Sequence, residues 1–412
     1  MSSAILQAIW RIAFYAPGFR GSDSYSEIAT NVIQTGGFTT SFRPPLYPLF
    51  LAAMMTLFGE NWETAAVIGQ SLISVALGYL VYSLACRISQ SSSAGFFALA
   101  LYLSNFLFQF EITAKRETTL FTVLLLIFFH VALFTPNLSK RYMLMALSAA
   151  LAFLLRPNAV ALLPVGLFVL YLDRKSPQFS LLKPVLAGLL FLAVIYPWQS
   201  FVYQHSGTFP ITTSTNSGQT LWKGNNPYLL SVWPKADIDI IEEEMTRQIG
   251  GVDITTAAGD SLLKQAAVEF IKQHPQLSLR NAFIKAGLFF FPVPIPMGEG
   301  QIEVSGETAK FTKYRYRNIL LLALATLHSV IMIGGCLGFM FQARDADETR
   351  KRVALLVLIL TVLLVALHSL TYPESRYRWP LDIVWTVLAG CYLSKLIGSK
   401  FSGLLCKKKP QS

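Results

Sequence analysis

Long apolar runs recur along the chain, and they limit what it can fold into more than any other feature. The clear runs lie at about residues 64–87, 94–110, 118–134, 142–155, 158–172, 181–198, 318–341, 353–370 and 381–396. A run of about 20 apolar residues can cross a bilayer as a helix, and a helix satisfies its own backbone in lipid. Together with a shorter run at 4–18, these runs predict an all-α polytopic membrane protein with about ten transmembrane helices.

Composition points the same way. Of 412 residues, 53% are hydrophobic and 14% are charged, whereas soluble domains carry about 25% charged residues. The formal net charge is +11, but Lys and Arg are scattered in loops between the apolar runs. This pattern favours anionic lipid and the positive-inside rule as the cause of the charge. We therefore expect membrane lipids as partners and no nucleic acid. The four cysteines have neither disulfide nor metal-site spacing.

Basic groups in the loops predict how the helices are oriented. Lys and Arg gather in cytoplasmic loops, so the side that collects most of them is expected to face the cytoplasm. The groups that fall on one side when the spans alternate are residues 140–141, 174–175, 344, 350–352 and 407–409. The chain is thus expected to be a multi-pass protein of a bacterial cytoplasmic membrane.

The same alternation predicts three regions. The first is an N-terminal transmembrane module at 1–198, with an outer first loop at 19–60. The second is an outer polar segment at 199–317, and the third comprises C-terminal helices and a basic tail at 318–412. Apolar stretches at 45–59 and 283–296 are too short to cross comfortably, so we expect them to be interfacial helices. Amphipathic helices are predicted at 237–248 and 261–273. The run at 4–18 lacks the features of a removable signal peptide, and whether it is a complete span stays open.

Cations on the predicted outer side break the positive-inside rule. An anionic ligand at the outer interface would compensate for the cost of translocating them. The alternative for any one of them is a side chain that snorkels to lipid headgroups. Because five separate loops break the rule, and because the Arg fork fits phosphate oxygens, we favour the ligand. These cations are Arg43, Lys115, Arg116, Arg156, Lys313, Arg315, Arg317, Arg376 and Arg378.

Acids share that side. Asp23 lies in a polar interval, residues 19–48, between apolar runs, and we interpret it as the reactive carboxylate. Its alternative role is to cap a helix that begins at Tyr25. Glu117 opens a predicted span directly after Lys115 and Arg116, where a carboxylate could instead simply stabilise a helix N-terminus. No pair of histidines has metal-ligand spacing, so no metal site is predicted.

The order of these motifs resembles a known family. Asp23 with Tyr25, followed by Arg43-Pro44-Pro45-Leu46-Tyr47-Pro48, is similar to the first outer loop of GT-C membrane glycosyltransferases. Within that family it resembles the branch of protein O-mannosyltransferases and the lipid A aminoarabinose transferase. One departure is Ser24, which stands where the family commonly has a second acid. Further motifs that match in order are Glu117, Leu155-Arg156-Pro157, residues 222–227, His274-Pro275 and residues 376–380.

The resemblance implies a GT-C-like fold and transfer of a monosaccharide from a polyprenyl-phosphate donor at the outer face. The acceptor is a lipid, a glycan or a protein. Asp23 would be the catalytic base, with Glu117 as a second catalytic acid, and in-line attack predicts inversion. No cofactor is assigned, and a requirement for a divalent metal stays open. The predicted phosphate-binding residues are Arg43, Lys115, Arg116, Lys285, Arg376 and Arg378, and the predicted sugar- or acceptor-binding residues are Tyr25, Tyr47, Asn225 and Asn226.

Two other classes of protein stay open. A secondary transporter usually places charges near the midplane of repeated halves, whereas here the charges gather at one face and no repeat is evident. An outer-leaflet glycan polymerase or ligase would use a diphosphate-linked donor instead. The size of the donor cavity would distinguish it from a monosaccharide transferase.

Overall fold

The structure is a computed structural model that describes residues 24–207, 212–232, 241–291, 300–304, 307–311, 317–372 and 375–406. Several features named above lie outside these residues: the apolar run at 4–18, Asp23, Lys313, Arg315 and the basic group at 407–409.

In the first half of the described chain, all regular secondary structure is helical. The predicted span at 94–110 is divided at Asn105, whose side-chain oxygen accepts a hydrogen bond from the Phe108 amide and so starts a new helix. The other predicted runs form helices close to their expected places. The elements are α2 (Tyr25–Thr35), α3 (Leu46–Phe58), η1 (Gly59–Asn61), α4 (Trp62–Ser89), α5 (Ser92–Ser104), α6 (Phe106–Ile112), α7 (Thr118–Phe134), α8 (Leu138–Phe153), η2 (Pro157–Ala161), α9 (Leu162–Asp173) and α10 (Leu182–Ser206).

The second half contains the polar segment and the last three long helices. The helix expected from about residue 283 begins earlier, at Pro275, because proline fits the first turn of a helix. One antiparallel hairpin, β1–β2, was not predicted. The elements are α11 (Ser217–Gly224), α12 (Leu229–Val232), α13 (Glu242–Gln248), α14 (Ala257–Gln273), α15 (Pro275–Phe289), β1 (Gly300–Val304), β2 (Glu307–Phe311), α16 (Arg317–Ala343), α17 (Glu348–Leu370), η4 (Ser375–Tyr377) and α18 (Trp379–Cys406).

The protein is an integral membrane protein, and the predicted all-α class is confirmed apart from that hairpin. Within the described ranges, five helical stretches are long and apolar enough to cross a bilayer, and three shorter apolar stretches accompany them. The predicted count of about ten spans stays a prediction. The long stretches are Leu46–Ser89, Leu182–Ser206, Ala323–Ala343, Glu348–Leu370 and Trp379–Gly398.

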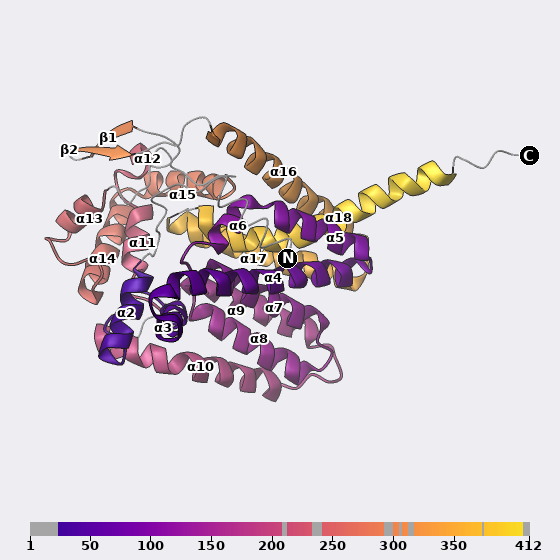
Figure 1. The fold of residues 1–412 in the computed structure, drawn as a ribbon, viewed down its shortest axis with the longest axis horizontal. Helices are drawn as coiled ribbons and strands as arrows, with labels where there is room; N and C mark the ends of the chain where they lie inside the picture. The colour runs from indigo at the N-terminus through magenta and orange to yellow at the C-terminus, as the bar shows by residue number, and fades with distance from the viewer. Residues whose placement is uncertain are drawn as a thin grey trace, which may run out of the picture.

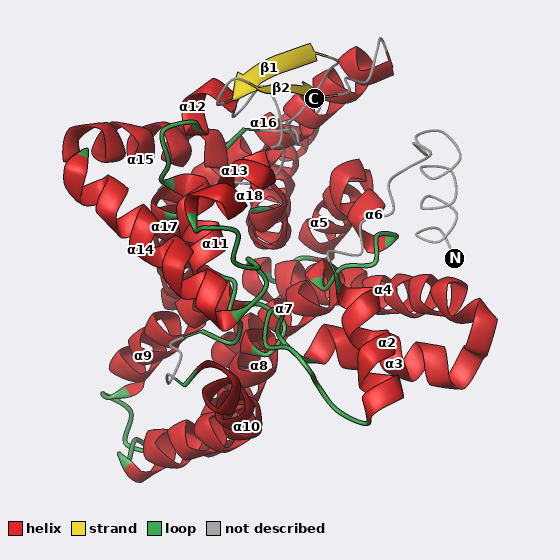
Figure 2. Ribbon diagram, turned by 90° about the vertical axis from the view of Figure 1, so that its left-hand side faces the viewer, coloured by secondary structure: helices red, strands yellow, loops and turns green. Residues whose placement is uncertain are grey.

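Two hydrophobic cores hold the described chain together. The larger one joins the apolar helices, and α18 packs closely across α5. The smaller one, formed by Trp222, Leu229, Met245 and Leu263 with others, lies within the polar segment and includes Tyr372 after α17. Figure 1 shows α11, α13, α14 and α15 gathered at one end of the long helices, and Figure 2 looks onto that end.

Three long helices, α4, α17 and α18, connect this polar-segment end with an opposite end. With 28 residues, α4 alone is about 42 Å long. At the opposite end Asp173 accepts hydrogen bonds from Arg141 at 2.8 Å and from Arg352 at 3.0 Å. The basic loops at 140–141, 174–175 and 350–352 therefore meet there, and we call it the basic-loop end. Which side of the membrane it faces stays a prediction.

Candidate active site

Tyr25 on α2 and Tyr47 on α3 dock the predicted first outer loop against the membrane helices. Their rings meet edge to face with centroids 5.0 Å apart, and the Arg43 guanidinium carbon lies 5.6 Å from the centre of the Tyr25 ring. The Tyr47 hydroxyl donates to the Gln70 side chain at 2.7 Å. Gln70 in turn donates to two backbone carbonyls in the segment that leads to α7. The loop is thus anchored to α4 and to the start of α7.

A buried network of acids and cations lies at the start of α7. Glu117 accepts a hydrogen bond from Arg156 Nε at 2.5 Å. Arg156 Nη2 donates to the Thr118 hydroxyl at 2.8 Å, and this hydroxyl donates to Glu111 Oε1 at 2.8 Å. Arg116 Nη1 lies 3.6 Å from the other Glu111 oxygen. The backbone bond from Leu46 to Leu154 ties this network to the head of α3.

Aromatic rings close the network on the side of α17 and η4. The Tyr377 ring lies near two guanidinium carbons, 5.9 Å from that of Arg156 and 5.5 Å from that of Arg376. The His368 ring stacks on Tyr377 with centroids 5.0 Å apart. We call the assembly the acid–arginine cluster, which consists of Tyr25, Arg43, Tyr47, Glu111, Arg116, Glu117, Thr118, Arg156, Arg376 and Tyr377.

The electrostatics of the cluster favour an anionic ligand. Burial raises the pKa of the Glu111 carboxyl, and the nearby Arg116 and Arg376 limit that rise. Arg156 is only 4% exposed, yet its Nη1 has no hydrogen-bond partner among the described residues. A buried guanidinium with an unused donor is costly unless an acceptor arrives. Over the described chain the cluster holds four arginines and two glutamates, so a phosphate oxygen is a fitting acceptor.

Lys115 lies at the edge of the cluster with a partner of its own. Its ammonium is 2.6 Å from the Glu63 carboxylate and 5.3 Å from the centre of the Trp62 ring, both at the head of α4. It is therefore next to the cluster in sequence and in space, but its charge is already paired.

Arg378 is fully buried and bound internally. Its guanidinium donates to both oxygens of Asp382, at 2.8 and 3.2 Å. It also donates to the backbone carbonyls of Phe289 and Phe291. This side chain joins the C-terminal end of α15 to the head of α18, and we assign it that structural role in place of the predicted phosphate contact.

The joint between α11, α15 and α17 contains Lys285, Asn225 and Asn226. Lys285 has no exposed surface and donates to the carbonyls of Gly224 at 2.8 Å and Thr371 at 3.1 Å. Asn225 donates to the Leu370 carbonyl, and Asn226 donates to carbonyls of its own helix end. All three are buried and hydrogen-bonded within the protein. Their predicted contacts with phosphate and sugar stay predictions, which this geometry does not favour.

Four residues of the cluster, Glu111, Thr118, Arg156 and Tyr377, were not among the predicted site residues, and the two charged ones among them bear on the chemistry. Arg156 was noted as an outer cation within a family-like motif, and Glu111 is an acid in a predominantly apolar stretch. A charge placed among apolar residues at a span end was the signal that could have identified both. Over the described ranges, no group of three or more His, Cys, Asp or Glu side chains could hold a metal ion.

Comparison with known proteins adds a family resemblance. Residues 42–201 match the family model described as dolichyl-phosphate-mannose-protein mannosyltransferase. The predicted resemblance to the GT-C glycosyltransferases is confirmed over this stretch, which contains Arg43, Glu111, Arg116, Glu117 and Arg156.

Two individual proteins are also similar. An uncharacterized protein of Aquifex aeolicus (strain VF5) is 24% identical over 206 residues, which are 48% of this chain and 41% of that protein. The aligned part thus spans less than half of the relative's own length. The crystal structure of ArnT from Cupriavidus metallidurans bound to undecaprenyl phosphate overlaps 99% of this chain and 80% of its own, with 14% identity and a TM-score of 0.40.

Proposed function

We propose that the protein is a membrane glycosyltransferase that moves a monosaccharide from a polyprenyl-phosphate donor to a lipid, glycan or protein acceptor at the outer face of the membrane. The observation that carries the proposal is the acid–arginine cluster, in which a buried arginine keeps an unused donor. The family match over residues 42–201 supports it, because its description names a phosphate-linked sugar donor.

The reaction requires the protein to supply a base and to stabilise the leaving phosphate. An acceptor oxygen or nitrogen attacks the anomeric carbon while the bond from that carbon to the phosphate oxygen breaks, with inversion. The acceptor proton needs a base, and the phosphate leaves with added negative charge that fixed cations can stabilise. We assign the base to Asp23, which precedes Tyr25 by two positions in the sequence.

We assign the phosphate to Arg43, Arg376 and the free donor of Arg156. The first two flank aromatic rings of the cluster and are only partly buried. Glu117 is bound to Arg156, so we propose that it positions this arginine and that it does not take the proton. Tyr25 and Tyr47 would then shape the sugar side of the site by packing, since the Tyr47 hydroxyl is used by Gln70.

The decisive experiment compares variants in a strain that lacks the protein. Lipid-linked sugars and envelope glycans would be measured by mass spectrometry after complementation, and transfer rates would be measured in membranes. A general base contributes about 10²- to 10⁴-fold, so Asp23→Asn should lower the transfer rate by that factor at unchanged protein level. Full activity of Asp23→Asn would remove the base from the scheme.

Arg376→Ala tests the phosphate assignment separately. Loss of one charge-assisted contact should weaken donor use by about 10- to 100-fold, visible as a higher KM for the donor and little change for the acceptor. Arg376→Lys should recover part of the loss. Arg280→Ala, an exposed arginine on α15, is the matched control and should behave as the unmodified protein. Equal effects on donor and acceptor would argue against a phosphate contact.

A further inference from the structure

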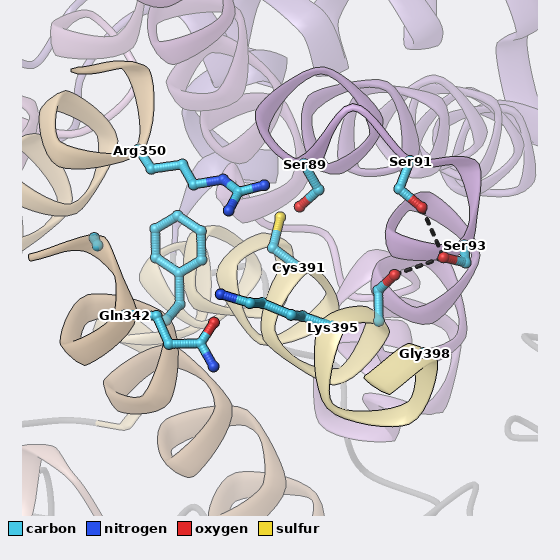
Figure 3. Close-up of a pocket in the computed structure, with 11 residues that line it drawn as sticks. Ser89, Ser91, Ser93, Gln342, Arg350, Cys391, Lys395 and Gly398 are labelled. Carbon is cyan, nitrogen blue, oxygen red and sulfur yellow. Dashed lines mark hydrogen bonds between the residues drawn. The ribbon is translucent and has the colours of Figure 1, made fainter. Parts of the chain in front are cut away.

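A cavity of about 470 Å³ lies at the basic-loop end, far from the acid–arginine cluster along α4. It is lined by the C-terminal part of α4, the head of α5, and α16, α17 and α18. Figure 3 shows Arg350 and Lys395 reaching toward it from α17 and α18, with a group of serines at its other side. Nothing in the proposed transfer reaction uses these residues.

Two cations of the cavity have hydrogen-bond donors that no described residue accepts. The side chain of Lys395 makes no ion pair or hydrogen bond with the described residues. The buried Nε of Arg350 lies 3.4 Å from an oxygen of the exposed Asp347, an ion pair without hydrogen-bond geometry, so this guanidinium makes no side-chain hydrogen bond with the described residues. The lining residues include neither Asp nor Glu. The cavity therefore has a positive potential that an anion would neutralise.

Hydroxyl groups supply further donors beside the cations. The Ser93 hydroxyl is 2.7 Å from that of Ser91 and 2.5 Å from that of Ser394. In this chain of hydroxyls, at least one hydrogen can turn toward a ligand, because each serine both donates and accepts. An Arg fork, a Lys ammonium and hydroxyl donors together form a set that fits the several acceptor oxygens of a phosphate group.

The surroundings of the cavity favour the phosphate of a lipid over a free phosphate compound. Phe339 and Ala343 of α16 line the cavity beside the cations. On the same helix Leu337 is 58% and Phe341 70% exposed, as is expected of side chains that contact acyl chains. The volume lies in the range of small-molecule sites, about 300 to 1,000 Å³, so it is large enough for a lipid headgroup whose acyl chains would lie along α16 outside. Basic pockets between membrane helices are known to favour anionic headgroups.

We propose that this cavity is a binding site for the phosphate headgroup of an anionic lipid, in the leaflet at the basic-loop end. Arg350 and Lys395 bind the phosphate oxygens, and the hydroxyl of either Ser93 or Ser394 donates one further hydrogen bond. The lipid joins α5, α16, α17 and α18 at the end of the molecule opposite to the acid–arginine cluster.

The test uses the purified full chain in detergent. Binding of phosphatidylglycerol, phosphatidylcholine and inorganic phosphate would be measured by native mass spectrometry and by the shift in Tm. Phosphatidylglycerol should bind and raise Tm, and neither of the other two should do so at the same concentration. Equal binding of phosphatidylcholine would overturn the proposal, and so would full competition by inorganic phosphate, which would mark a site for a free phosphate compound.

Variants locate the binding. Arg350→Gln and Lys395→Gln should each weaken phosphatidylglycerol binding by about tenfold. Lys351→Gln removes the same charge from the neighbouring, exposed position on α17 and should leave binding unchanged. Equal weakening by all three variants, or none by the first two, would contradict the assignment. The comparison of lipids on the unmodified protein still decides the proposal if a variant fails to fold.

Discussion

At the scale of single residues, Lys285 shows how a charged side chain can be used for architecture. It is fully buried on α15, and its ammonium donates to two carbonyls that belong to α11 and to the end of α17. Burial lowers the pKa of Lys285 to about 8. A lysine in this position can titrate within an accessible pH range and report on the joint between these helices.

The direction of the pH effect follows from linkage. The unfolded chain holds the lysine proton up to a pKa of about 10.4, whereas the folded protein loses it near pH 8, so unfolding takes up a proton between these values. Stability should therefore rise as pH increases from about 8 to about 10.4. Two pKa units correspond to about 3 kcal/mol as an upper limit.

This prediction can be checked by thermal unfolding in detergent from pH 7.5 to 10.5. The unmodified protein should gain stability relative to Lys285→Met across that interval, because methionine has no proton to lose. Parallel curves for the two proteins would show that the ammonium is not penalised in the folded state.

At the scale of elements, the end of α11 packs directly onto the end of α17. A Cβ atom added at Gly224 would lie 2.0 Å from the Thr371 carbonyl oxygen, which is far inside van der Waals contact. Asn225 and Lys285 bridge the same two helix ends. Glycine is thus required there so that the polar segment can pack against Tyr372. This packing positions η4 so that Tyr377 lies in the acid–arginine cluster.

Gly224→Ala should therefore separate these two helix ends and lower stability by about 1 to 3 kcal/mol. Gly287→Ala on α15 is the matched control, because a Cβ there meets nothing within 4 Å. Alanine is the better helix former by up to about 1 kcal/mol, so this control should be neutral or stabilising. Tm values of the two variants decide the point, and equal values would contradict the close contact.

At the scale of the whole molecule, the acid–arginine cluster and the basic-loop end lie at opposite ends of α4, α17 and α18. Arg350 lines the cavity near the head of α17, while His368, near the other end of that helix, stacks beside the cluster. Lipid-facing helices of this length separate two aqueous compartments. If the basic loops face the cytoplasm, the cluster must face outward.

Cysteine labelling in spheroplasts tests this orientation. The background would have its four native cysteines, Cys86, Cys336, Cys391 and Cys406, changed to alanine. Lys272→Cys, exposed on α14, should react with a membrane-impermeant maleimide in intact spheroplasts. Lys175→Cys, exposed at the basic-loop end, should react only after permeabilisation. The reverse pattern would place the cluster inside and exclude transfer at the outer face.

Much of the helical architecture could be predicted because hydropathy is a local property. The runs at 118–134 and 353–370 became α7 and most of α17, since an apolar run in lipid has to satisfy its backbone within itself. The break at Asn105 was missed because it depends on one side-chain contact. The hairpin was missed because the alternation of Gln301 and Glu303 with Ile302 and Val304 extends over only a few residues.

The candidate site was predicted less completely. Arg43, Arg116, Glu117 and Arg376 were selected from sequence and are joined in the cluster by Arg156 and Glu111. Lys285, Arg378 and the two asparagines were selected by the same reasoning, yet the folded chain uses their polar groups internally. Sequence cannot separate these cases, because a buried cation needs an acceptor whether that acceptor is a ligand or a backbone carbonyl.

By itself, the sequence determined that this chain is a helical membrane protein, because long apolar runs allow no other backbone arrangement in lipid. It also determined that charges are concentrated at span ends, since the bilayer centre excludes them. Only the tertiary structure decided which of those charges meet. The pairing of Glu117 with Arg156, 39 residues apart, and of Lys285 with the end of α17, 86 residues away, depends on how helices dock. Docking is set by side-chain packing between elements, which no local pattern encodes.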